Sequence, residues 1–174
     1  MNTLELIRKR CSVRQYLSEP IEEDKLSYLL EAARLSPSAC NFQPWYFLVV
    51  TEEEGRKKLH ACYPRKWVEP VPLFLVVCSD HSRSWKRPSD GKDHSDVDAG
   101  IATEHICLAA AELDLGSCII CHFDAPLLRT SFGLPEWVEP VAILPIGYPS
   151  EPDIFAATPK NRKPAGEIIR RERF

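Results

Sequence analysis

Residues 36–51 read SPSACNFQPWYFLVVT, and this stretch decides how the chain divides into elements. Pro37 and Pro44 stop helix on both sides of a short polar loop that holds Asn41. Most residues from Trp45 to Thr51 are aromatic or β-branched, which predicts a strand. The sequence therefore places an irregular loop directly before the first strand.

Two helices are expected before this loop. Thr3 can cap the first, over residues 4–10, which ends in basic residues that suit the helix dipole. The second follows Pro20 and covers about 21–34. Its apolar stripe consists of Leu26, Leu29, Leu30 and Ala33. One face of the second helix should therefore be buried.

Further strands and helices follow the first strand without strict alternation. An unbroken apolar run over 73–79 predicts a strand covered on both faces. A polar segment over 80–95 leads into a long helix over about 96–114, and Gly116 is expected as its left-handed stop. The other expected elements are a helix over 52–63, a strand over 117–122, a helix over 125–132, a strand over 138–148, an extended arm over 149–164 and a helix over 165–172.

This order predicts an α+β fold, because the elements do not alternate as regular βα units. Pro140 and Pro145 interrupt the last strand, so that strand should lie at an edge or contain a bulge. No internal repeat or linker divides the chain, which predicts one domain over residues 1–174. The extended arm has too few apolar residues for a core of its own and needs a surface to lie on, such as another subunit.

Composition excludes several classes of protein. The 174 residues are 44% hydrophobic and 27% charged, as in ordinary globular domains. No apolar run is long enough to span a bilayer, and the N-terminus lacks the pattern of a signal peptide. The seven cysteines are an odd number and suit reduced thiols better than a secreted disulfide framework. We therefore expect a cytoplasmic protein without a membrane segment.

Charge is distributed unevenly along the chain. The net charge is −3, yet residues 1–14 carry +3 and residues 159–174 carry +4, so the middle is strongly acidic. The two basic ends are either solvated tails or two parts of one anion site, for which a phosphate is the best candidate. A nucleic-acid surface is disfavoured, because the acidic body would repel a polyanion.

Arg10, Ser12 and Arg14 form the strongest anion-binding pattern. Their spacing places all three side chains on one face of an extended segment. Guanidinium groups match phosphate oxygens in a two-pronged geometry, and the Ser12 hydroxyl adds a neutral donor. The glycine-rich nucleotide loops are absent from the sequence, so side chains would have to hold a phosphate. Taken alone, the pattern would indicate a solvated basic helix end.

Four motifs follow one another along nearly the whole chain. They are Arg-x-Ser-x-Arg-x-aromatic at 10–16, Pro-Ser-x-x-Asn-x-Gln-Pro-Trp at 37–45, Asp98 leading a small-residue helix to Leu115-Gly116-Ser117, and Lys160-x-Arg162-Lys163-Pro164. In this order and spacing they resemble the nitroreductase family of FMN-dependent oxidoreductases, and the motif at 37–45 is the most specific.

The resemblance implies a nitroreductase-like α+β fold with a central, mainly antiparallel sheet flanked by helices. It also implies an intertwined homodimer, with the C-terminal arm exchanged onto the partner and FMN at the dimer interface. The residues implied to contact FMN are Arg10, Cys11, Ser12, Arg14, Pro37, Ser38, Asn41, Gly116, Ser117, Lys160 and Arg162. Many relatives carry a second arginine where this chain has Cys11.

The function implied by the resemblance is hydride transfer from NADH or NADPH to FMN. A small electron-poor acceptor, such as a nitroaromatic or a quinone, would then be reduced in a ping-pong scheme. The cofactor carries this chemistry, so neither a catalytic side chain nor a metal is expected.

Several alternatives stay open. On the same fold they are reductive dehalogenation and oxygen-dependent flavin use. A flavin-binding protein without turnover and a nucleic-acid accessory that uses the basic ends are the other classes.

Several cysteines and histidines suggest other chemistry, but each has a simpler interpretation. Cys118 and Cys121 have the spacing of a redox motif, yet they fall in a predicted strand and lack a second ligand pair, so buried thiols are expected. Cys40 is expected to be a free core cysteine. The five histidines show no metal spacing, and His105 is expected in the core or at an interface.

Overall fold

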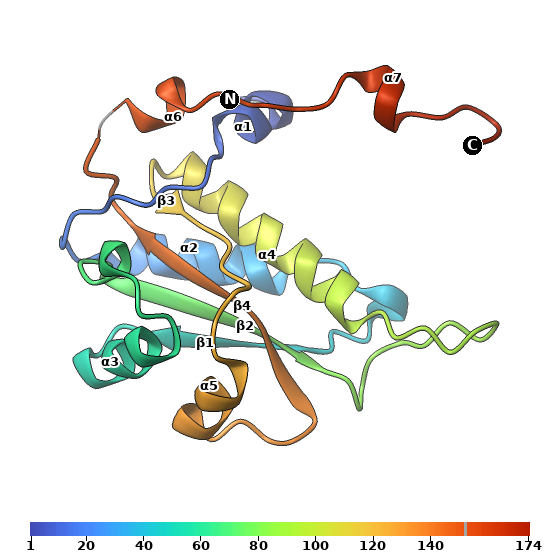
Figure 1. Cartoon of the computed structure of the whole chain (residues 1–174), viewed down its shortest axis with the longest axis horizontal. Coiled ribbons are helices and arrows are strands. Elements are labelled where there is room, and N and C mark those ends of the chain that lie inside the picture. Colours follow the sequence, from blue (N-terminus) through green and yellow to red (C-terminus); the bar gives the residue numbers. More distant parts are fainter. Residues whose placement is uncertain (152) are drawn as a thin grey trace.

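Four strands form one antiparallel sheet in the computed structural model, which describes residues 1–151 and 153–174 (Figure 1). In spatial order they are β1 (Trp45–Val50), β2 (Leu73–Asp80), β4 (Val138–Gly147) and β3 (Gly116–Ser117). Each neighbouring pair is antiparallel. The predicted α+β class with a mainly antiparallel sheet is confirmed.

Helices cover both faces of this sheet. α2 (Glu23–Arg34) and α4 (Ser95–Glu112) pack on one face, and α3 (Glu53–Cys62) and α5 (Ala125–Phe132) pack on the other (Figure 1). The remaining elements are short and lie outside these layers. They are α1 (Thr3–Lys9), α6 (Ile154–Ala157), α7 (Ala165–Ile168) and the 3-10 turns η1 (Ala39–Asn41) and η2 (Lys66–Val68).

β2 is buried along its whole length, as its unbroken apolar run predicts. Successive side chains of a strand point to opposite faces. Leu73, Leu75 and Val77 therefore join the core beneath α2 and α4. Phe74 and Val76 join the second core, which includes residues of α3 and α5. This strand is the common wall of two hydrophobic cores.

The last strand, β4, is internal and bulged. Pro140 pairs with Cys78, while the next pair along is Ala142 with Val77, so the register shifts between them. The predicted bulge is confirmed. The alternative edge position is wrong, because β3 pairs with β4 on the side away from β2.

Two predicted helix ends are wrong. Asn2 rather than Thr3 caps α1, since its side chain accepts from the Glu5 backbone N–H while the Glu5 carboxylate accepts from the Asn2 N–H. Asp114 rather than Gly116 takes the left-handed conformation after α4, with φ of 58°. Gly116 instead begins β3.

Three predictions about the C-terminal half need correction. The strand expected over 117–122 is only β3, followed by an isolated bridge between Ile120 and Ile143. The arm over 149–164, expected to contain no helix, includes α6, and Pro152 lies outside the described residues. The last helix ends at Ile168 instead of continuing to residue 172. Within the described part of the chain, no helix has the length and hydrophobicity that crossing a membrane requires.

Candidate functional site

The segment that follows α1 lies beside β3. Ser12 and Ser117 form an isolated parallel bridge, and the Val13 N–H donates to the Ser117 carbonyl oxygen at 3.0 Å. Gly116 permits this approach, because a Cβ there would lie 2.8 Å from the Cβ of Val13. The structure thus brings the first motif together with the predicted contacts at Gly116 and Ser117.

The side chains of this segment alternate between the core and the opposite face. Cys11 and Val13 are buried, with 3% and 1% of their surface exposed. Arg10 and Ser12 are half-buried and Arg14 is exposed, so the shared face predicted for them is present. The Cys11 thiol belongs to the hydrophobic core, which leaves its backbone as the part that a ligand could contact.

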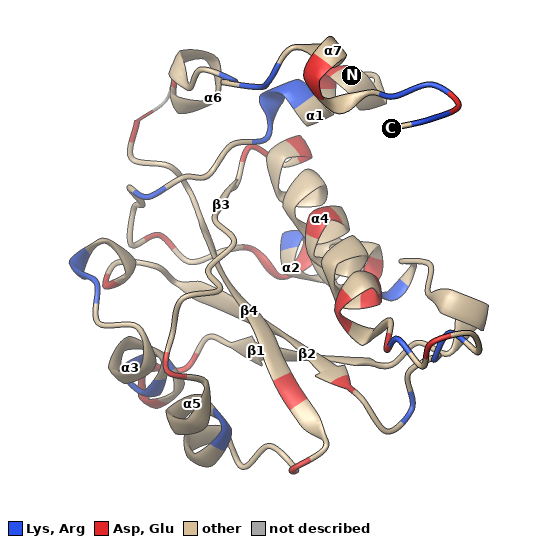
Figure 2. Ribbon diagram, turned by 45° about the vertical axis from the view of Figure 1, so that its right-hand side comes forward, with Lys and Arg blue, Asp and Glu red and all other residues tan. Residues whose placement is uncertain are grey.

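The two basic ends of the chain meet at Arg10. The Lys160 ammonium group donates to the main-chain carbonyl of Arg10. Figures 1 and 2 show the arm after α6 passing close to α1, with basic segments on both. The convergence expected from the charge distribution is therefore present within one chain.

This meeting point holds positive charge that the protein compensates poorly. Burial lowers the pKa of Lys160, and the nearby Arg10 and Arg162 charges act in the same direction. The Arg10 Nε is buried and has no hydrogen-bond partner among the described residues. The nearest carboxylate oxygen paired with it, on Glu104, is 3.9 Å away, too far for a hydrogen bond. A buried donor and three neighbouring cations against one carboxylate fit an anionic group such as a phosphate.

The proline-framed loop is held at the start of α4. The Ala39 N–H donates to the Asp98 Oδ1 at 3.0 Å, and Asp98 is 1% exposed. Cys40, Asn41 and Gln43 all have positive φ, between 50° and 57°. This conformation is costly for non-glycine residues and often marks functional loops. Asn41 is exposed and ready to meet a ligand, as are its neighbours in the turn.

The loop and the basic cluster around Arg10 and Lys160 meet α4 at different turns. Asp98 is in the first turn of α4, whereas the Arg10 Nε lies 3.9 Å from a carboxylate oxygen of Glu104 and the Lys9 ammonium pairs at 2.5 Å with Asp114, which follows the helix. Asp98 and Glu104 are six residues apart, which is about 9 Å along the helix axis. One chain therefore brings together the basic cluster with Gly116 and Ser117. Across residues 1–151 and 153–174, no hydrogen bond or ion pair joins Pro37, Ser38 or Asn41 to that cluster.

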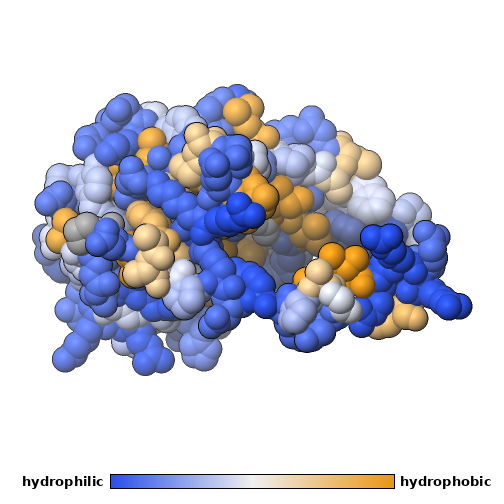
Figure 3. Space-filling model, turned by 90° about the horizontal axis from the view of Figure 1, so that it is seen from above, coloured by the Kyte–Doolittle hydropathy of each residue, from blue (hydrophilic) through white to orange (hydrophobic). Residues whose placement is uncertain are grey.

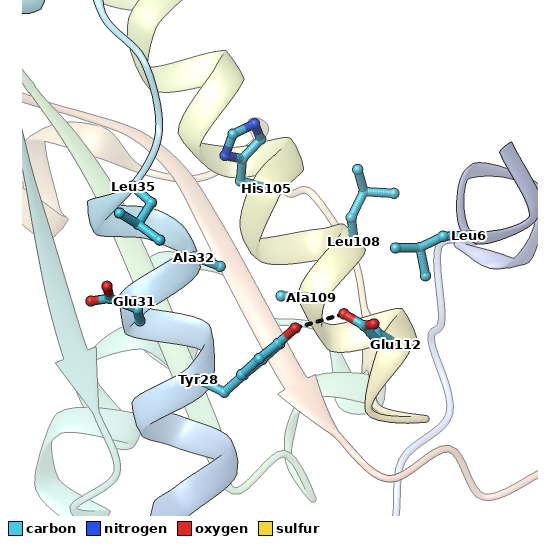
Figure 4. A pocket seen from close by; sticks show the side chains of 9 residues that line it. All are labelled: Leu6, Tyr28, Glu31, Ala32, Leu35, His105, Leu108, Ala109 and Glu112. Atoms are coloured by element: carbon cyan, nitrogen blue, oxygen red, sulfur yellow. Dashed lines mark hydrogen bonds between the residues drawn. The ribbon is translucent and has the colours of Figure 1, made fainter. Parts of the chain in front are cut away.

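A groove of about 350 Å³ lies between α1, α2 and α4. In Figure 4 the Tyr28 hydroxyl of α2 donates across the groove to the Glu112 carboxylate of α4, at 2.7 Å. His105 lines the groove and lies 3.0 Å from the Ser36 hydroxyl. The other lining residues are Leu6, Glu31, Ala32, Leu35, Leu108 and Ala109. Figure 3 shows hydrophobic residues around a hollow on the face that carries α1 and the arm.

The model of the Nitroreductase family matches residues 7–62 and 59–148 of the chain. The chain belongs to this family. A nitroreductase family protein of Clostridium difficile 630 has the same fold, with a TM-score of 0.89 over the full length of both chains and 38% sequence identity. The nitroreductase fold predicted from the four motifs is confirmed.

Two relatives add information about the family's activities. A protein of Methanothermobacter thermautotrophicus, provisionally named NADH dehydrogenase/NAD(P)H nitroreductase, is 34% identical over 87% of this chain and 79% of its own length. The FMN reductase [NAD(P)H] of Bacillus subtilis strain 168 is 30% identical over 80% of this chain and 63% of its own length.

Sequence reasoning missed two features of this member of the family. Glu104 approaches Arg10, and it is the one acidic residue in the stretch 99–111, a signal that could have revealed it. The second feature concerns the thiols. Cys118 is buried as expected, but Cys40 and Cys121 are exposed, contrary to prediction. Cys40 lies in the turn η1, and Cys121 lies beyond β3, in a segment that does not continue the strand.

Proposed function

We propose that the chain is an FMN-dependent oxidoreductase that takes hydride from NADH or NADPH. The observation that carries the proposal is the contact of the Lys160 ammonium group with the carbonyl of Arg10, whose buried Nε has no partner among the described residues. The names of the relatives, which include an FMN reductase, support the same activity. The proposal therefore rests on both the geometry and the family.

The basic cluster would hold the phosphate of FMN. Arg10, Arg14 and Arg162 would supply guanidinium groups, Lys160 an ammonium group and Ser12 a hydroxyl donor. Backbone groups at Gly116 and Ser117 would lie along the ring. When bound, FMN supplies the ring that accepts and donates hydride, so no side chain needs to act as nucleophile or general base.

The proline-framed loop would be contributed by a second copy of the chain. Asn41 can both donate and accept hydrogen bonds, which suits the amide-like pyrimidine edge of a flavin. Because no described contact joins Asn41 to the basic cluster of its own chain, we infer that a complete site combines the cluster of one copy with Pro37, Ser38 and Asn41 of another.

The groove between α1, α2 and α4 is the surface proposed for this self-association. Leu35, 62% exposed, lies on its rim, and Leu4 and Ile7 expose apolar side chains on the adjacent α1. All described residues from 161 onward are exposed, and exchange of this arm onto the partner remains a proposal. Leu35→Glu should give monomers that bind little FMN, measured by sedimentation and flavin absorbance. Leu127→Glu, on α5, is the matched control and should stay dimeric.

The activity is tested with the purified yellow protein under anaerobic conditions. The flavin absorbance should bleach when NADH or NADPH is added, and one nicotinamide should act faster than the other. Bound flavin that stays oxidised with both donors would contradict the oxidoreductase and favour a flavin-binding protein without turnover. The cofactor released on denaturation should be FMN.

The acceptor is proposed only as a class, small and electron-poor. After anaerobic reduction, nitroaromatics, quinones, halogenated phenols and oxygen should be added separately. The compound that restores the yellow colour fastest identifies the reaction. Ping-pong kinetics would appear as parallel lines in double-reciprocal plots.

All seven cysteines are free in the structure, which supports the prediction of a reducing, cytoplasmic location.

A further inference from the structure

We propose that His81, Asp96 and Glu139 form a site for a first-row divalent metal ion such as Zn²⁺. One ligand atom from each of these side chains lies within 4.8 Å of the other two. His81 follows β2, Asp96 is in the first turn of α4, and Glu139 is near the start of β4. Figure 2 shows acidic segments on the first turns of α4 and on the nearby parts of β2 and β4. The cluster shares the first turn of α4 with Asp98, which holds the proline-framed loop, but none of its three residues is among those proposed to contact FMN.

The geometry of His81 suits a metal ligand. Its Nε2 lies 2.9 Å from the Glu139 Oε2, a separation that two ligands can have when each is about 2.0–2.2 Å from one ion. Its Nδ1 lies 3.2 Å from the Asp93 Oδ2. A carboxylate on the second ring nitrogen is the usual partner of a metal-bound histidine, because it fixes the tautomer and orients the ring.

Asp93 is itself held in place. Its Oδ1 accepts hydrogen bonds from the Ser84 hydroxyl and from the Ser95 backbone N–H, each at 2.8 Å. Ser95 begins α4, and Asp96 follows it directly. Asp93 thus links the His81 ring to the first turn of α4, which also carries the proposed ligand Asp96.

The charge of this cluster also points to a cation. Three carboxylates, of Asp93, Asp96 and Glu139, surround one imidazole. Across residues 1–151 and 153–174, the ion pairs of these carboxylates include His81 and no lysine or arginine. A proton on His81 supplies one positive charge, whereas a divalent ion supplies two. The negative charge of the three carboxylates therefore exceeds the positive charge that His81 can supply, and a divalent cation would reduce this excess.

The ligand set selects the kind of ion. One imidazole nitrogen and two carboxylates suit Zn²⁺ and its first-row neighbours better than Mg²⁺ or Ca²⁺, which prefer all-oxygen sites. Both carboxylates are exposed, so the ion can enter from solvent, and water can complete the coordination. A bound ion would tie the segment over 80–95 to the sheet and to α4.

The test uses the full-length protein, treated with EDTA, desalted and titrated with Zn²⁺ by calorimetry. The wild type should bind one equivalent, and Zn²⁺ should raise its Tm. Glu139→Gln and Asp96→Asn, both at exposed positions, should each weaken binding at least about tenfold. Asp93→Asn should weaken it by about 10–100-fold through the orientation of His81.

Two controls separate this site from other Zn²⁺ ligands. His122→Ala removes an exposed histidine outside the cluster and should leave the affinity unchanged. Cys121→Ser tests the exposed thiol and should also leave it unchanged. Equal Zn²⁺ affinity in the wild type and in Glu139→Gln would overturn the proposal, as would loss of binding in Cys121→Ser. In either case His81 would serve only as an ion-pair bridge between Asp93 and Glu139.

Discussion

The Lys160 ammonium group donates a hydrogen bond to the carbonyl oxygen of Arg10, a residue 150 positions earlier in the chain. This contact closes the chain's two basic ends into one cluster. Because the carbonyl accepts only part of the hydrogen-bonding capacity of an ammonium group, Lys160 keeps donors for a second partner. The contact therefore holds Lys160 beside Arg10 and leaves the other N–H donors of its ammonium group available for a ligand.

Removing single cations from this cluster should weaken FMN binding. Arg14→Ala, Lys160→Ala and Arg162→Ala each remove a charge-assisted contact of roughly 1.5–3 kcal/mol, or about 10–150-fold in Kd. Fluorescence titration of the apoprotein with FMN measures this. Lys163→Ala, an exposed neighbour in the same arm, is the control and should bind like the wild type. Unchanged affinity in all three cluster variants would contradict the proposed site.

FMN affinity should fall at alkaline pH. A phosphate favours the charged form of Lys160, and burial lowers the pKa of that group below its usual 10.5. As pH rises through this lowered pKa, the ammonium group loses its proton and the attraction to phosphate is lost. Arginine does not titrate in this range, so Lys160→Arg should flatten the pH profile of Kd. Parallel profiles for the two proteins would count against Lys160 as a phosphate ligand.

Gly116→Ala should destabilise the protein by about 1–3 kcal/mol, because the new methyl group would collide with Val13 beside the Ser12–Ser117 bridge. Urea unfolding measures the change. Gly100→Ala, in α4 with nothing within 4 Å of the added Cβ in the chain, is the matched control. That substitution should be neutral or stabilising by up to about 1 kcal/mol. A stable Gly116→Ala protein would show that the segment can move away from β3.

Asp98→Ala should loosen the proline-framed loop. The substitution leaves the Ala39 N–H without its acceptor and should cost about 1–3 kcal/mol. Asp98→Asn keeps an oxygen acceptor at the same place and should cost less. Hydrogen exchange of the Ala39 amide reports the contact directly. Equal exchange rates in both variants and the wild type would mean that Asp98 does not hold the loop.

Local signals predicted much of the fold. α5 occupies the predicted residues 125–132, because Asp124, Pro126 and Gly133 mark its ends with a cap, a proline in its first turn and a left-handed stop. The unbroken apolar run of β2 predicted burial on both faces. By contrast, α6 is a single turn in a segment without helical periodicity, and its position depends on tertiary contacts such as the packing of Phe155 on the core.

The sequence indicates which residues are candidates for the site, but it does not show where the fold places them relative to one another. Arg10, Ser12, Arg14 and Asn41 are candidates because they sit in short contiguous motifs. Which turn of α4 each motif lies against depends on how that helix sits in the fold. The cluster around His81 gave no sequence signal, since its members come from three separate elements that only folding brings together.

The placement of the loop and the basic cluster against different turns of α4 has a genetic consequence. Suppose that each flavin site combines the basic cluster of one copy with the loop of another. An Arg14 variant then damages the cluster's contribution to a site, and an Asn41 variant damages the loop's contribution. Subunit exchange between the two defective proteins would create mixed dimers. In each mixed dimer one site would carry both lesions and the other would carry neither. Colour and turnover should then reappear in a mixture of two inactive preparations, which is complementation between alleles of a single gene.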